Sequence, residues 1–231
     1  KENIPCHALE PWAMVQSERF RNMVIRGFHT ELEAVYEEFN MSLTNDFEKM
    51  NNALYAILFP HHPYGTQTTI GTQQHLKNPS LRTVMQYYRE WYVPNNVAIC
   101  MSGDLDPDET VRIIEKYFGD WQPSDSLPKR IFPQEKPLEA PVSVDVVGME
   151  TPMVALGWRL PAKADPQYGI MSVVQQILTN GKCGLFDENL NNAQQVMQAM
   201  TFLDGMTDQS AFWAIGCPKE GQSLEEVRDL M

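Results

Sequence analysis

The spacing of apolar residues switches between helical and strand-like along the 231-residue chain, and this pattern constrains the fold more than any other feature. Apolar residues that recur every three or four positions predict helices at 11–28, 30–43, 50–58, 81–91, 108–118, 165–180, 223–231 and, with an interruption, 185–200. Alternating or short apolar runs predict strands at 97–101, 142–147, 153–160 and 211–216. Because the two patterns mix without the regular alternation of a doubly wound parallel sheet, the sequence predicts an α+β fold in which helices flank an antiparallel sheet.

Capping patterns mark the start of two of these helices. Thr30 is followed three residues later by Glu33, and Ser223 by Glu226, which is the spacing of a capping box. The segment 59–65 holds two prolines and a glycine, which remove backbone donors and favour turns, so it is predicted to end a helix. A loop rich in Thr, Gln and Gly is expected after it.

A proline-rich stretch divides the chain. Five prolines lie between residues 123 and 141, where the apolar periodicity is weak. This composition is typical of a linker between domains. We therefore predict a first domain over residues 1–125, a linker over 126–141 and a second domain over 142–231.

The charge balance and the cysteines argue against several classes of protein. The 18 basic and 30 acidic residues give a net charge of -12, which repels anionic polymers, so nucleic acid is not an expected partner. No run approaches the roughly 18 apolar residues of a membrane span. The four cysteines form no Cys-x-x-Cys pair, which argues against a zinc ribbon or a thioredoxin-type site and leaves their disulfide state open. We expect a soluble protein, and both cytoplasm and periplasm fit it.

Four glutamates lie within eight residues of the helix predicted at 30–43, and their spacing separates them. Glu31 and Glu38 are seven residues apart, about 20° short of two full turns, so they share one face, on either side of Val35. Glu33 and Glu37 form a second pair that is best interpreted as a solvated edge. A carboxylate on the apolar side of a helix is costly unless a positive partner faces it. An arginine, a hydrogen-bond network and a divalent metal all fit, and the simplest alternative is that all four glutamates form a solvated surface.

A series of motifs in fixed order points to a known family. The motifs are Glu31-Leu32-Glu33-Ala34-Val35-Tyr36-Glu37-Glu38, Leu58-Phe59-Pro60, His62-Pro63-Tyr64-Gly65, Gly71-Thr72, Tyr92-Val93-Pro94-Asn95-Asn96, Ser102-Gly103-Asp104, Leu156-Gly157-Trp158-Arg159-Leu160-Pro161, Ile177-Leu178-Thr179-Asn180-Gly181 and Gly184-Leu185-Phe186. Together they cover nearly the whole chain. The sequence resembles the pitrilysin/insulinase family of zinc metallopeptidases.

This resemblance implies roles for two of the glutamates and an organisation for the chain. In that family two histidines of His-x-x-Glu-His and a glutamate on a later helix bind zinc, and Glu38 matches the later glutamate. Glu31 matches a carboxylate that lies near the metal without binding it. The resemblance further implies two related domains, each incomplete here: residues 1–125 as the C-terminal half of the metal-bearing domain, 126–141 as the linker, and 142–231 as the first part of a non-catalytic domain.

The chain departs from the family in one respect. Its five histidines include no pair with the spacing of His-x-x-Glu-His, so that motif is expected before Lys1 or not at all. His61 and His62 follow a helix and neighbour prolines, and we interpret them as loop residues. His29 lies on a different face from Glu31 and is interpreted as a packing or solvated residue.

These observations lead to two competing hypotheses about function. The first is that the chain is part of a zinc-dependent endopeptidase that binds peptide or unfolded polypeptide, is inactive alone, and needs the N-terminal part of the same protein. The second is a non-catalytic relative that acts as a scaffold or a peptide-binding subunit. Under either hypothesis an uncovered sheet edge or apolar face allows self-association of the fragment.

Overall fold

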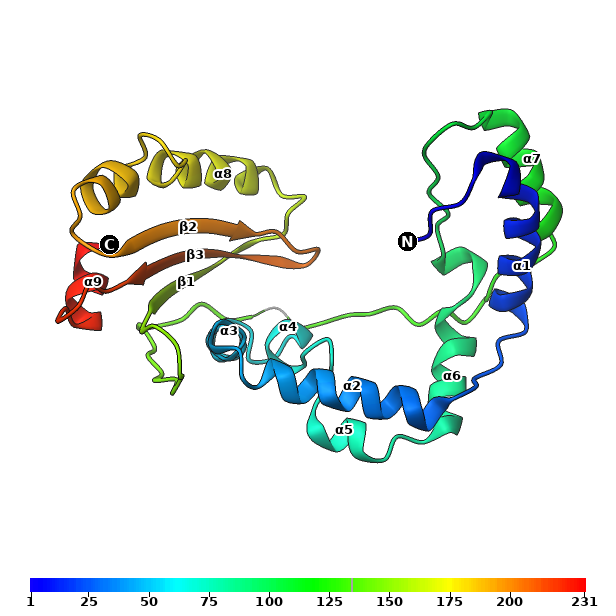
Figure 1. Ribbon diagram of the computed structural model, residues 1–231, viewed down its shortest axis with the longest axis horizontal. Coiled ribbons are helices and arrows are strands. Elements are labelled where there is room, and N and C mark those ends of the chain that lie inside the picture. Colours follow the sequence, from blue (N-terminus) through cyan, green and yellow to red (C-terminus); the bar gives the residue numbers. More distant parts are fainter. Residues whose placement is uncertain (134) are drawn as a thin grey trace. The chain divides into compact units, whose positions relative to one another are not determined.

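The computed structural model describes residues 1–133 and 135–231. The chain forms two compact units, each assembled from two separate stretches of sequence. The helical unit comprises residues 1–36 and 73–131, and the sheet unit comprises residues 37–72 and 132–231 (Figure 1). The predicted domain boundary at 126–141 refers to the domains of a longer protein. The two units do not test that boundary, so it stays a prediction.

The helical unit is built on the packing of α1 against α7. Its elements are η1 (Cys6–Ala8), α1 (Leu9–Arg21), the first part of α2 (Phe28–Ser42), α5 (Gln73–Lys77), α6 (Leu81–Trp91), η2 (Pro94–Asn96) and α7 (Pro107–Phe118). Lys116 of α7 donates to Glu10 Oε1 at 2.7 Å. The Tyr88 hydroxyl of α6 donates to the carbonyl oxygen of Phe20 at 3.1 Å, so both later helices hold α1.

Two helix predictions in this unit are wrong at their ends. Helix α1 stops at Arg21 and does not reach residue 28. Gly27 follows in the left-handed region at φ 65°, and its carbonyl accepts the first hydrogen bond of α2 from the Glu31 N–H at 3.0 Å. Because α2 therefore begins at Phe28, Thr30 lies inside the helix and does not form the predicted capping box.

Two predicted strands do not form. Residues 97–101 and 142–147 have no regular structure. A strand is stable only when its backbone groups pair with a neighbour. Within the described ranges, no backbone hydrogen bond joins residues 98–101 or 142–147 to another segment. Both segments thus have a strand-like sequence, but neither pairs with a neighbouring strand among the described residues.

The sheet unit contains a three-stranded antiparallel sheet, as the predicted α+β fold requires (Figure 1). The strands are β1 (Val154–Pro161), β2 (Gln198–Asp204) and β3 (Gln209–Cys217), in the order β1-β3-β2. Trp158 of β1 pairs with Phe212, and Phe202 of β2 pairs with Trp213. Strands β1 and β3 form where the sequence predicted them. The helix predicted at 185–200 is wrong at its end, because the pairing of Gln198 with Cys217 draws its last residues into β2.

Four helices of the sheet unit start at side-chain caps, namely α3 (Asp46–Leu58), α4 (Pro63–Thr66), α8 (Pro166–Leu178) and α9 (Leu224–Leu230). The π-helical turn η3 (Asp187–Asn192) follows Phe186 without a side-chain cap. Asn45 caps α3, Asp165 caps α8, and Ser223 forms the predicted capping box with Glu226 at α9. No helix in the described part of the chain has the length and apolarity that a bilayer span requires.

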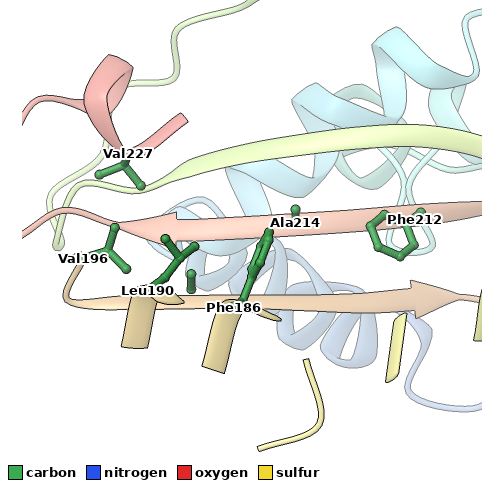
Figure 2. Packing of buried hydrophobic residues seen from close by; sticks show 7 residues of the cluster. Phe186, Leu190, Val196, Phe212, Ala214 and Val227 are labelled. Carbon is green, nitrogen blue, oxygen red and sulfur yellow. The ribbon is translucent and has the colours of Figure 1, made fainter. Parts of the chain in front are cut away.

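The core of the sheet unit lies on both faces of β3. On one face, residues in and next to η3, β2 and α9, among them Ala199, pack against the strand. Figure 2 shows side chains of this cluster gathered along it: Phe186, Leu190, Val196, Phe212, Ala214 and Val227. On the other face, α3 packs on the strand through Tyr55, Leu58, Phe59, Ala211, Trp213 and Ile215. Since consecutive strand residues point to opposite faces, β3 is the central, doubly covered strand.

Candidate functional site

The two candidate site residues, Glu31 and Glu38, lie on helix α2. This helix carries four glutamates and neither lysine nor arginine. At a rise of about 1.5 Å per residue, Glu31 and Glu38 are about 10 Å apart along the helix axis. The Glu33 and Glu37 pair has i,i+4 spacing, at which like charges repel. Helix α2 therefore presents a strongly negative surface that favours a cation.

Both candidate carboxylates are exposed. No side chain of α2 is buried, and the apolar residues on the side of Glu38, Val35 and Phe39, are only half-buried. In the residues that the structure describes, the carboxylates of Glu31 and Glu38 have no hydrogen bond and no ion pair. A positively charged partner is therefore not found for either carboxylate among the described residues.

The described residues do not form a metal site by themselves. They contain no group of three or more His, Cys, Asp or Glu side chains that could hold a metal ion. Zinc takes three or four protein ligands. Glu38 can supply one carboxylate, which is too few for zinc, so this chain alone does not fit the metal.

A buried polar cluster in the sheet unit surrounds Glu135, for which the sequence predicted no role. Its side chain is only 1% exposed. Glu135 Oε1 accepts from the N–H of His61 at 2.7 Å and from the N–H of His62 at 2.9 Å, and Oε2 lies 3.0 Å from His61 Nδ1. Burial by itself raises the pKa of Glu135, but the three hydrogen bonds together outweigh it and lower the pKa below its ordinary value.

His62 is the second buried member of this cluster. Its side chain is 2% exposed, and its ring lies against those of Tyr64 and Phe132, with centroids 4.0 and 4.6 Å away. His62 Nδ1 accepts from the N–H of Tyr64 at 3.2 Å, so the ring proton is on Nε2, which faces Asp208 Oδ2 at 3.5 Å. His62 lies in a loop, as predicted. It is nevertheless buried among aromatic rings, and its side chain caps the start of α4.

Two tyrosines tie the α3 and α4 region to the hairpin between β2 and β3. The Tyr64 hydroxyl donates to Asp208 Oδ2 at 3.3 Å and accepts from the N–H of Asp208 at 3.2 Å. The Tyr55 hydroxyl donates to the Asp204 carboxylate. Burial and the nearby Asp204 raise the pKa of Tyr55. No signal in the sequence pairs these residues, because each pair is more than 140 positions apart.

The fold of the chain is that of known proteases. A protease from Helicobacter pylori superimposes with a TM-score of 0.82 at 19% identity, over 96% of this chain and 55% of that chain. The periplasmic protease PqqL from Escherichia coli superimposes with a TM-score of 0.72 at 16% identity, over 97% of this chain and 28% of that chain. The chain therefore shares its fold with these proteases.

A sequence profile identifies the family. Residues 80–231 match the profile described as the peptidase M16 inactive domain. The chain belongs to the peptidase M16 family, which confirms the predicted membership of the pitrilysin/insulinase group. The profile extends across the predicted linker.

Curated relatives include named zinc proteases and a processing peptidase. The zinc protease PqqE of Helicobacter pylori is 23% identical over 161 residues, which are 67% of this chain and 35% of that protein. The probable mitochondrial-processing peptidase subunit beta of Schizosaccharomyces pombe is 30% identical over 71 residues, which are 31% of this chain and 15% of that protein. The chain thus spans about a third of the length of PqqE.

Proposed function

We propose that the chain is part of a zinc-dependent metalloendopeptidase, in which Glu38 binds the metal and Glu31 supports the site. The observation that carries the proposal is the exposed carboxylate of Glu38, unpaired among the described residues, on a helix with four glutamates and neither lysine nor arginine. Two relatives are named zinc proteases, which supports zinc as the metal.

Each residue has a defined part in this proposal. A zinc ion held partly by Glu38 would supply Lewis acidity for peptide hydrolysis. Glu38 contributes one carboxylate ligand, and the remaining ligands come from polypeptide outside these 231 residues. Glu31, about 10 Å along the same face of α2, orients neighbouring ligands or water by hydrogen bonding. The isolated chain is accordingly inactive, because it has one ligand of the three or four that zinc requires.

The proposal also specifies partners and compartment. The substrate is peptide or unfolded polypeptide, and the necessary partner is the N-terminal part of the same protein. The protein is soluble and works in the cytoplasm or the periplasm. The E. coli neighbour is a periplasmic protease, which supports the periplasm.

A second candidate function is a non-catalytic subunit that binds peptide or serves as a scaffold. The matching profile is described as the inactive domain of the family. One relative is named as a subunit of a processing peptidase. Under this alternative the longer protein binds peptide without cleaving it.

The test compares Glu38→Gln with Glu33→Gln in the longer protein. Both variants remove one charge from an exposed position of α2. We expect Glu38→Gln to lower zinc content from about one per chain to less than about a tenth, with loss of peptidase activity, and Glu33→Gln to change neither. We expect Glu31→Gln to weaken zinc binding about 10- to 100-fold.

Three results would contradict the proposal. Unchanged zinc content in Glu38→Gln removes this residue from the site. Equal losses in Glu38→Gln and Glu33→Gln show a general effect of charge. A wild-type protein that binds peptide but holds no zinc and cleaves nothing supports the non-catalytic alternative.

A further inference from the structure

The corner between α2 and α3 is tightly hydrogen-bonded. Three residues connect the two helices, and the N–H group of each donates to a carbonyl oxygen of α2 at 3.0 to 3.3 Å. The last of the three, Asn45, also caps α3 by accepting from the N–H of Glu48 at 3.0 Å. Because the bonds of α2 continue directly into the cap of α3, the end of α2 that carries Glu38 follows the orientation of α3.

Asp46, the first residue of α3, fastens this corner to the loop that leads into β1. It is only 8% exposed. Its Oδ2 accepts from the N–H groups of Met149 at 2.5 Å and Glu150 at 2.6 Å, and its Oδ1 accepts from Lys49 Nζ at 2.9 Å. The bonds from Glu150 and Lys49 lower the pKa of Asp46 below its ordinary value, because they favour the ionised form. A charged acceptor makes both backbone bonds stronger than neutral ones.

The loop before β1 is shaped to admit this carboxylate. A Cβ atom at Gly148 would overlap the carboxyl group of Asp46. Gly148 does not lie in the left-handed region, so the close approach of Asp46, and not the backbone conformation, requires a glycine there. We refer to Asp46, Gly148 and the N–H groups of Met149 and Glu150 as the Asp46 latch.

The latch joins two parts of the chain that the sequence assigns to different domains. Asp46 belongs to the predicted domain 1–125, and the loop that it binds belongs to the predicted domain 142–231. In the structure, residues 37–72 nevertheless form part of the sheet unit. Glu135 fastens the loop after α3 in the same way, through two backbone N–H groups. Helix α3 is thus held to the sheet unit at both of its ends.

We propose that Asp46 is a positioning residue, which directs the end of α2 and the carboxylate of Glu38 by fastening the α2–α3 corner to the loop before β1. Glu38 and Asp46 are eight residues apart in the sequence, and hydrogen-bonded turns connect them. The inference rests on the proposed function only for the purpose of Glu38, since the latch itself contains no metal ligand. It gives the second predicted domain a task, which is to hold a residue of the first domain in place.

Hydrogen–deuterium exchange in the metal-free longer protein tests the latch. Asp46→Ala removes the acceptor, and we expect the amides of residues 43–45 to exchange at least about 10-fold faster than in the wild type. Asp46→Asn keeps one acceptor oxygen and is expected to give an intermediate rate. The matched control is Asp187→Ala, which removes a similarly buried carboxylate from three other backbone N–H groups of the same unit. We expect it to leave exchange at 43–45 unaltered; equal rates in Asp46→Ala and Asp187→Ala would overturn the proposal.

A second variant disturbs the latch without changing Asp46. Gly148→Ala places a methyl group where the carboxylate lies, so we expect the same acceleration at 43–45. In the double variant Asp46→Ala/Gly148→Ala that methyl group has room, and we expect no further acceleration. A wild-type rate in Gly148→Ala, or additive effects in the double variant, would contradict the geometry of the latch.

The zinc affinity of the longer protein tests the positioning role. We expect Asp46→Ala and Gly148→Ala to raise the Kd for zinc about 10- to 100-fold, as is typical when a residue that orients a metal ligand is lost. Asp187→Ala lowers stability as well but should leave this Kd unchanged. If Glu38→Gln abolishes zinc binding and Asp46→Ala does not weaken it, the positioning role is refuted. If Glu38→Gln retains its zinc, the proposed function is refuted, and the exchange measurement, made without metal, still decides whether the latch exists.

Discussion

Replacement of Glu135 by alanine is expected to destabilise the sheet unit by about 3 kcal/mol. The carboxylate accepts two hydrogen bonds from the backbone N–H groups of His61 and His62, at 2.7 and 2.9 Å. Each bond to a charged, buried acceptor contributes about 1.5 kcal/mol or more. The third bond, from the His61 ring, adds little because that side chain is 68% exposed and solvent screens it.

Urea denaturation followed by tryptophan fluorescence measures this loss. Trp213 is 1% exposed and lies in the sheet unit, so its emission reports on that unit. Glu135→Gln retains an acceptor oxygen for the two backbone groups and removes only the charge, so we expect a loss of about half that size. Glu139→Ala, at an exposed position nearby, is the control and is expected to change stability by less than about 0.5 kcal/mol.

The pH dependence follows from the lowered pKa of Glu135. Because the pKa is lower in the folded than in the unfolded protein, the ionised carboxylate stabilises the fold fully above its unfolded pKa of about 4.3. That contribution is lost as the pH falls through the folded pKa. The gap between wild type and Glu135→Ala should therefore be constant between about pH 6 and 8 and should narrow below about pH 4. A Glu135→Ala stability indistinguishable from that of Glu139→Ala would refute the reasoning.

Three further substitutions test the packing of the sheet unit. Gly65→Ala places a methyl group onto the carbonyl oxygens of Tyr55 and Phe59, and we expect about 2 kcal/mol of destabilisation by urea titration; a wild-type midpoint would contradict that geometry. Trp213→Ala removes a buried ring that stacks on Phe202 with centroids 5.3 Å apart, and about 3 to 5 kcal/mol should be lost in urea denaturation followed by far-UV circular dichroism, since the variant lacks the fluorescent reporter; a loss below about 1 kcal/mol would show that the ring is not tightly packed. Asp187→Ala removes the acceptor for three backbone N–H groups and should lower Tm and increase proteolysis within 179–185; unchanged proteolysis would exclude this anchoring role.

Local sequence signals predicted the elements that are stable for local reasons. The Asp165-Pro166 start of α8 and the Ser223 capping box of α9 involve neighbours in sequence, and both form as expected. The capping box predicted at Thr30 is wrong, because the helix begins earlier, at Phe28, directly after Gly27 in the left-handed region. Strand β2 was missed because its residues only become a strand when β3 lies alongside.

For the candidate site too, some features follow from local sequence and others depend on distant contacts. The shared face of Glu31 and Glu38 follows from helix geometry and could be predicted from spacing alone. Whether that face meets a metal depends on groups distant in sequence, which spacing does not encode. The role of Glu135 could not be predicted from the sequence. It is a hydrogen-bond acceptor for His61 and His62, which lie 74 and 73 positions earlier in the chain.

The sequence by itself determined the family, the α+β class and the positions of most helices, since these depend on ordered motifs and on interactions a few residues apart. Only the tertiary structure decided that Glu135 and His62 are buried partners and that β3 is covered on both faces. It also decided that residues 97–101, strand-like in composition, stay unpaired among the described residues. The physical reason is that a helix satisfies its own backbone groups, whereas strands and buried charges need partners that the fold brings from elsewhere.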